Sequence, residues 1–182
     1  MKTLQHTKYA LFYLFSFFLL LSCEKETPEI VEEQELITTV ELQFQASGEA
    51  PQTIRWEANQ TNVPTVTLNA NTAYEVAIAF LDESDPADVE DITEEVREEA
   101  YEHQVFFEFS GVTVDFTSGS SDTLDSDGNP VFLHTVWNAT STGTGIIKVY
   151  LIHEPTSKTS TTRAGFGGET DVAIEIPFTV VE

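Results

Sequence analysis

Alternation of apolar and polar residues is the feature that most constrains the fold of this chain. It is clearest in residues 73–81, where Tyr74, Val76, Ile78 and Phe80 are separated by single polar or small residues. Successive side chains of a strand point to opposite faces, so this period of two predicts a strand with one face on a core and the other in water. Similar runs, bounded by Gly, Pro, Asn and Asp clusters, recur at 36–46, 53–57, 65–68, 104–109, 112–116, 132–137, 146–152 and 172–180.

One stretch has a different period. Ile92, Val96 and Ala100 recur at four-residue spacing, and Asp91 with Glu94 three residues later has the pattern of a helix N-terminus. The sequence therefore predicts an all-β, immunoglobulin-like two-sheet sandwich of about seven to nine strands, with one short acidic helix inserted near residues 91–103.

The N-terminus has the pattern of an export signal. Lys2 and Lys8 precede an apolar run over residues 10–21, which is shorter than the stretch of about 20 residues that a membrane-spanning helix needs. The run ends at Ser22-Cys23, and charged residues follow at once. We therefore predict that residues 1–22 are a cleaved signal peptide and exclude them from the fold.

The segment Leu20-Leu21-Ser22-Cys23 resembles the lipobox of bacterial lipoproteins. The resemblance implies that Cys23 is acylated and becomes the new N-terminus, and several acyl chains would anchor the protein stably to a membrane. The alternative for Cys23 is a free thiol or a partner in an intermolecular disulfide. Since it is the single Cys of the chain, the folded domain has to be held by a core rather than by disulfides.

A glutamate-rich stretch follows the predicted anchor. Residues 23–35 are expected to form an acidic, extended, disordered tether, and residues 36–182 a single sandwich domain. Glu24-Lys25-Glu26 resembles the short export signal of lipoproteins from Bacteroidota-type bacteria. That resemblance implies an outer-membrane lipoprotein, and it favours the cell surface over a periplasm-facing position.

The chain is strongly acidic, with 31 Asp and Glu against 8 Lys and Arg and a formal net charge of −23. Proteins that track phosphates need the opposite sign, so the charge excludes nucleic acid and anionic lipid surfaces as partners. It favours a monomer, because copies repel one another, and it attracts cations.

An aspartate-rich run suggests a cation site. Asp122, Asp125, Asp127 and Asn129 surround Gly128, and several oxygen ligands on a flexible loop are what Ca²⁺ prefers. The same residues are also typical of a hairpin turn, in which Asp-Gly and Gly-Asn are common. Both interpretations remain open from the sequence.

A second cation hypothesis concerns three histidines. His103 lies at the end of the predicted helix, His134 lies within a strand, and His153 lies just past another strand. Imidazole suits Zn²⁺, Cu²⁺ or Ni²⁺, so the three side chains would form a transition-metal site if they met. The alternative is that each is a separate structural or surface histidine.

Catalytic motifs do not emerge from the sequence. It has no Gly-x-Ser-x-Gly elbow, no phosphate-binding glycine loop and no His-Glu-x-x-His, and Cys23 lies at the predicted anchor. We therefore do not expect an enzyme.

Three segments carry a further resemblance, namely 35–40, 91–104 and 168–172. Through them the chain resembles small lipoproteins of Bacteroidota-type bacteria that are often labelled as having a type 1 periplasmic-binding fold. That fold needs alternating strands and helices in two lobes, which the patterns described above contradict. The resemblance implies an accessory of TonB-dependent outer-membrane receptors, which import scarce nutrients including metals.

The sequence is thus interpreted as that of a lipid-anchored binding or accessory module. It would assist a TonB-dependent receptor in nutrient or metal capture. The alternative is a structural or adhesive cell-surface lipoprotein with no small-molecule ligand.

Overall fold

The computed structural model describes residues 35–182, and residues 34–182 form one compact unit of the chain. The predicted signal peptide, Cys23 and the tether up to residue 34 lie outside the described residues. Within residues 35–182, no helix is long and apolar enough to cross a membrane.

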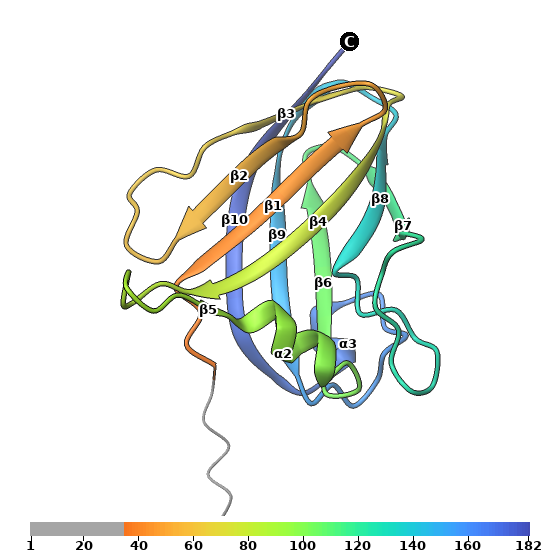
Figure 1. Cartoon of the computed structure of the whole chain (residues 1–182). Coiled ribbons are helices and arrows are strands. Elements are labelled where there is room, and N and C mark those ends of the chain that lie inside the picture. The colour runs from red at the N-terminus through yellow and green to blue at the C-terminus, as the bar shows by residue number, and fades with distance from the viewer. Residues whose placement is uncertain (1–34) are drawn as a thin grey trace, which may run out of the picture. The chain divides into compact units, whose positions relative to one another are not determined.

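The first sheet is antiparallel and holds the N-terminal strands (Figure 1). Its order is β2 (Gln52–Glu57), β1 (Thr39–Ala46), β4 (Ala73–Asp82), β8 (His134–Ala139) and β7 (Val114–Ser118). The two-residue strand β5 (Glu90–Asp91) pairs with the end of β4. This order leaves β7 as an edge strand.

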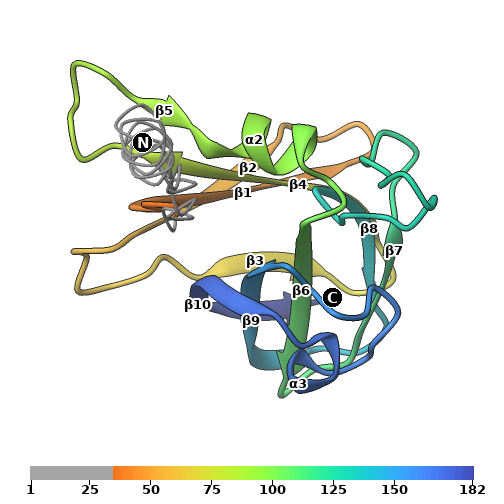
Figure 2. The same cartoon turned by 90° about the horizontal axis from the view of Figure 1, so that it is seen from below.

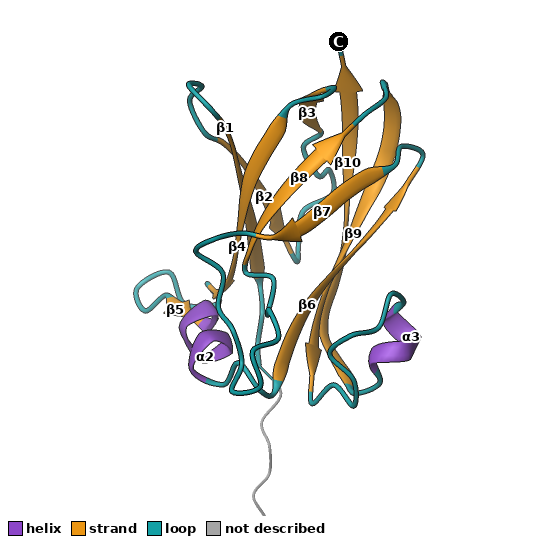
Figure 3. Ribbon diagram, turned by 90° about the vertical axis from the view of Figure 1, so that its right-hand side faces the viewer, coloured by secondary structure: helices purple, strands orange, loops and turns teal. Residues whose placement is uncertain are grey.

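The second sheet has the order β3 (Val66–Asn69), β10 (Glu169–Val181), β9 (Gly143–His153) and β6 (His103–Ser110). β3 runs parallel to β10, and the other pairs are antiparallel. The two sheets form two facing layers (Figure 2). β6 is an edge strand of this sheet, and it lies on the same side of the sandwich as β7 (Figure 3).

The predicted all-β two-sheet sandwich is confirmed. Each of the nine alternating runs corresponds to a strand, and residues 35–182 contain ten strands rather than the expected seven to nine. The additional strand is β5, which is too short to leave a periodic pattern. Strand β4 shows why the alternation was informative, because Tyr74, Val76, Ile78 and Phe80 are all buried on its inner face.

Trp137 lies within the core between the sheets. Its ring makes edge-on contacts with Phe44, Phe107 and Phe109, at centroid separations of 5.5, 5.0 and 4.9 Å. Its indole N–H donates a hydrogen bond of 2.7 Å to Thr135 Oγ1, which satisfies the buried polar group of the ring. The core thus joins β1 and β8 of the first sheet to β6 of the second.

The predicted acidic helix exists but is shorter than expected. Helix α2 (Ile92–Glu98) begins at Asp91, whose carboxylate accepts a hydrogen bond from the backbone N–H of Thr93. Glu94 does not reach back to complete the capping box, because it pairs with Arg97 instead. The helix ends at Glu98, and a turn leads into β6, so His103 opens a strand rather than closing the helix.

A second helix was not predicted. Helix α3 (Arg163–Phe166) lies in the loop between β9 and β10, in a segment with no apolar periodicity. Phe166 is 1% exposed and packs on Phe106 with ring centroids 4.9 Å apart, covering the outer face of the second sheet. Burying a side chain of this size contributes about 1.5–3 kcal/mol, enough to hold so short a helix in place.

Candidate functional site

The aspartate-rich run is a loop that is held together by its own carboxylates. Asp122 Oδ1 accepts hydrogen bonds from the backbone N–H groups of Thr123 and His134, at 2.9 and 3.0 Å. Asp122 Oδ2 accepts from the Ser118 hydroxyl at 2.8 Å and from the N–H of Phe132 at 3.1 Å. Asp122 therefore fixes the loop to the ends of β7 and β8.

Asp125 has the same role at the tip of the loop. Its carboxylate accepts hydrogen bonds from the N–H groups of Asp127 and Asn129 and from the Asn129 side-chain amide, at 2.9, 2.8 and 3.0 Å. Lys158 Nζ lies 3.9 Å away, and the two side chains are 1% and 10% exposed. Burial raises the pKa of Asp125, but the Asn129 and Asp127 hydrogen bonds and the Lys158 charge outweigh it, and the net shift is downward.

These contacts correspond to the hairpin-turn interpretation of residues 122–129. Gly128 adopts a positive φ of 85° at the bend, and Asp127 is exposed. Across residues 35–182, no group of three or more His, Cys, Asp or Glu side chains is arranged to hold a metal ion. The calcium hypothesis thus has no preformed geometry in support.

The three histidines are not brought together as a set. His103 and His153 are register partners in β6 and β9, and their rings stack at 5.0 Å with 9° between the planes. His134 lies in the other sheet, where it pairs with Ala77 of β4. The structure therefore assembles two of the three predicted ligands.

The histidine pair lies near the half-buried carboxylate of Asp171. His103 is 1% exposed, and its burial lowers its pKa, partly offset by a contact of 3.3 Å between Nδ1 and the Glu99 carbonyl. Burial raises the pKa of Asp171, whose Oδ2 has no hydrogen-bond partner within residues 35–182. Desolvation favours the neutral form of both groups.

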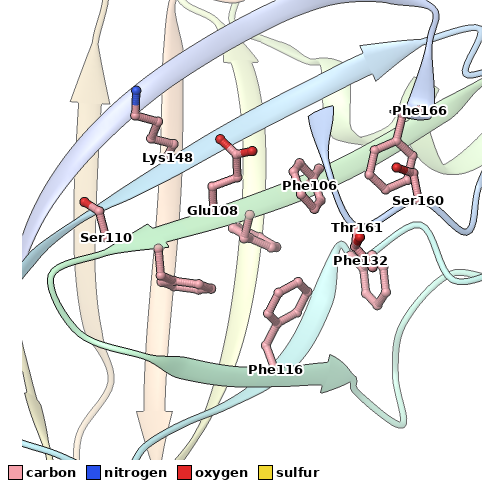
Figure 4. A pocket seen from close by; sticks show the side chains of 11 residues that line it. Phe106, Glu108, Ser110, Phe116, Phe132, Lys148, Ser160, Thr161 and Phe166 are labelled. Carbon is pink, nitrogen blue, oxygen red and sulfur yellow. The ribbon is translucent and has the colours of Figure 1, made fainter. Parts of the chain in front are cut away.

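A different feature is a hollow in the surface of the described residues. A hollow of about 620 Å³ runs along β6, at the side of the sandwich where the edges of the two sheets meet (Figure 4). Its lining combines aromatic rings with a few polar side chains, from Phe106, Phe107, Glu108, Phe109, Ser110, Phe116, Phe132, Lys148, Ser160, Thr161 and Phe166.

One wall of the hollow is aromatic and faces the space between the sheets. Phe116 of β7 contacts Phe107, Phe109 and Phe132, with ring centroids 5.6, 5.8 and 5.6 Å apart. Phe132 has a φ of 67°, an uncommon value for a bulky residue. The Asp122 carboxylate accepts a hydrogen bond from the N–H of Phe132, so the aspartate-rich loop helps to position this wall of the hollow.

The other wall lies on the outer face of the second sheet and is more polar. Glu108 accepts a hydrogen bond of 3.0 Å from the Tyr150 hydroxyl, and Lys148 pairs with Glu175 at 2.7 Å. Phe106 and Phe166 close this wall on one side. The hollow thus offers apolar area on one side of β6 and a carboxylate on the other.

The sequence patterns did not predict this hollow. Its signal was the run Val105-Phe106-Phe107, which is apolar on both faces of a strand and so requires cover on both sides. That run does not reveal where along the strand the residues that cover it end.

Comparison of the chain with family models, curated proteins and solved structures finds no match in any of the three.

Proposed function

We propose that this protein is a non-catalytic binding module, held to the outer membrane through an acylated Cys23, and that the hollow along β6 is its ligand-binding surface. The observation that carries the proposal is the hollow itself, about 620 Å³ in volume and lined by aromatic rings from both sheets. Concave, mostly apolar surfaces with a few polar groups are the usual form of binding sites.

The chemistry of the lining supports binding rather than catalysis. Glu108 and Lys148 are its ionisable side chains, and each is already engaged, with Tyr150 and Glu175 respectively. Ser110, Ser160 and Thr161 are its hydroxyl residues, and no histidine lies in the lining to act as their base. The side chains are placed to position a ligand by contact and hydrogen bonding.

The membrane anchor and the location rest on the sequence. The apolar run over residues 10–21, the lipobox-like Leu20-Leu21-Ser22-Cys23 and the charged residues that follow support a surface-exposed outer-membrane lipoprotein. In this proposal the partner is a TonB-dependent receptor, whose accessory the protein would be. The domain would act as a monomer, because its negative charge opposes self-association.

The proposal is tested in living cells of the source bacterium. Incorporation of labelled palmitate should occur in the wild-type chain and be lost in Cys23→Ala. A photo-crosslinking amino acid at exposed Thr161, in the hollow, should form an adduct with a TonB-dependent receptor identified by mass spectrometry. The same amino acid at exposed Glu57, on β2, is the matched control and should form none.

The crosslinking separates this function from the structural or adhesive alternative. A receptor adduct from position 161 and not from position 57 supports the accessory role. Equal labelling from both positions, or adducts with surface polymers alone, contradicts it. Unchanged palmitate incorporation in Cys23→Ala contradicts the anchor.

A further inference from the structure

We infer that the ligand of the hollow is an extended polypeptide segment that adds as a strand to the open edge of β6, with apolar residues alternating with basic ones. This inference rests on the proposed function, since it specifies what the binding surface takes. The hydrogen bonding of β6, the two walls beside it and the charge of the domain support it.

Within residues 35–182, β6 pairs with β9 alone, and hydrogen bonding shows which of its backbone groups point away from β9. The N–H of Val105 donates a 2.9 Å hydrogen bond to the Val131 carbonyl, so the backbone groups of Val105 face outward from the sheet. Antiparallel pairing alternates along a strand, and the backbone groups of His103, Phe107 and Phe109 therefore face outward as well.

The first half of this edge is closed. The Lys158 ammonium donates to the carbonyl of His103, and the Gln104 side-chain amide donates to the carbonyl of Val105 at 2.9 Å. Together with the bond from Val105 to Val131, these contacts occupy both outward groups of Val105 and the outward carbonyl of His103. Proteins commonly protect exposed strand edges in this way.

The second half is open. No protein group within residues 35–182 bonds to the outward N–H or C=O of Phe107 or Phe109, and both residues line the hollow. These two residues present two donors and two acceptors at the two-residue spacing of a strand. That is the pattern with which an added strand forms its ladder.

The walls determine which side chains the added strand carries. Residues directly opposite each other in an antiparallel pair point to the same face. The residues of the added strand opposite Phe107 and Phe109 would therefore contact the aromatic wall with Phe116 and Phe132. Such residues have to be apolar. The residue between them would lie opposite Glu108 on the outer face, and it is basic.

Charge favours a basic segment over a second copy of this chain. The formal net charge is −23, and the Lys and Arg side chains of the described domain already contact carboxylates or carbonyls. An antiparallel pair of two β6 strands centred on the open half would place Glu108 opposite Glu108. Like charges directly opposite are destabilising, which disfavours a dimer through this edge.

The test uses residues 24–182, which include the whole compact unit 34–182. The probe is a fluorescein-labelled peptide about nine residues long in which Val and Lys alternate, a length that covers the open edge with flanks. Fluorescence anisotropy measures the affinity of the domain for this peptide and for two methylated peptides. One is N-methylated at the backbone nitrogens of Val and the other at the backbone nitrogens of Lys. A peptide with Glu in place of Lys is the charge control.

Strand addition requires the two methylated probes to differ, because alternate backbone N–H groups of an added strand face β6 and solvent. We expect Val methylation to weaken binding about tenfold and Lys methylation about twofold or less, as in antiparallel addition. The reverse order also supports strand addition and assigns a parallel orientation. Equal effects, or no binding of the unmodified probe, overturn the inference.

Two variants of the protein test the same edge from the other side. Phe109→Pro removes an N–H that β9 does not use, and Phe109→Ala is the matched control that loses the same aromatic contacts. With both variants folded by circular dichroism, we expect Pro to bind the probe about fivefold more weakly than Ala. Equal affinities contradict the inference, as does unchanged binding in Glu108→Gln.

Failure of the peptide tests and failure of the proposed function are distinguishable. A receptor adduct from position 161 with no peptide binding would retain the accessory role and reject strand addition. Peptide binding without a receptor adduct would retain strand addition and reject the receptor as the partner.

Discussion

Asp125 provides the sharpest test of what the aspartate-rich loop does. Its carboxylate accepts three hydrogen bonds from Asp127 and Asn129 and lies 3.9 Å from Lys158. The Asp125 side chain is 1% exposed, so replacing it with Ala leaves a charge on Lys158 without its counter-ion in a largely buried position. If Asp125 is a calcium ligand, this variant should keep its stability in the absence of metal. If Asp125 holds the loop together, the variant should lose stability in the absence of metal.

The magnitude follows from the environment of the pair. Breaking a buried ion pair by removing one partner costs about 3–5 kcal/mol. Water can reach the freed N–H of the exposed Asp127, and Lys158 keeps its bonds to the carbonyls of Ala100 and His103. We therefore expect Asp125→Ala to lower the free energy of unfolding by about 3 kcal/mol, at the low end of that range.

For a domain of this size, that loss corresponds to a decrease of about 6–12 °C in melting temperature. Lys158→Met keeps the apolar stem of the side chain and leaves Asp125 with its hydrogen bonds, so we expect a loss of about 1–2 kcal/mol. Because the two residues form one unit, the double variant should lose less than the sum of the single losses.

The assay is thermal and urea unfolding of residues 24–182, measured in EDTA and in saturating Ca²⁺. The structural role requires the full loss in EDTA and the same melting temperature in both buffers for the wild-type chain. A ligand that binds only the folded state has to raise its stability. If Ca²⁺ raised the melting temperature and Asp125→Ala abolished that rise while leaving the stability in EDTA unchanged, the loop would be a calcium site and our reasoning would be refuted.

Three further predictions concern single residues. Burial raises the pKa of Glu35 to about 7, with Glu95, Asp171 and Glu90 adding to the shift. A raised pKa means that stability is lost as the pH rises from the ordinary value of about 4.5 through 7. Urea unfolding should therefore show Glu35→Gln to be more stable than wild type by about 1–2 kcal/mol at pH 8 and equal to it below pH 4. Asp122→Asn places an amide donor against the N–H of Phe132, and we expect the free energy of unfolding to fall by about 2 kcal/mol and binding in the hollow to weaken. Asp127→Asn, at an exposed position, should change neither stability nor binding in the same assays. Gly145→Ala would bring a methyl group to 2.0 Å from the Ser110 carbonyl oxygen and 2.6 Å from the Phe178 ring, so we expect a loss of about 3 kcal/mol or more by thermal unfolding, with Gly48→Ala, where no atom lies within 4 Å, as the milder control.

Local pattern predicted the strands well, because the face that each one buries is encoded in its own residues. The alternation in β4 and in β10 identifies the buried residues correctly, and Asp91 marks the start of α2. The order of strands in the sheets depends instead on residues far apart in sequence, such as Phe178 and Val66 in the parallel pair of β10 and β3. No local pattern carries that information.

The candidate site was harder to predict for the same reason. Whether an aspartate ligates a metal or holds a loop depends on which N–H groups reach it, and Asp122 receives those of Phe132 and His134 from across the loop. His103 and His153 meet because β6 pairs with β9, while His134 lies in the other sheet. The open half of β6 is defined by the position of Val131 and Lys158, which come from two other loops.

The position of β1 has a mechanical consequence if the domain is tethered at its N-terminus, as we propose. The chain enters the fold through residues 35–38 and continues directly into β1, which lies between β2 and β4 (Figure 1). Backbone hydrogen bonds of an antiparallel ladder are perpendicular to the strands, so a pull along β1 loads its bonds to both neighbours at once instead of opening them one by one. Tension applied at this end in the direction of β1 is therefore resisted in shear.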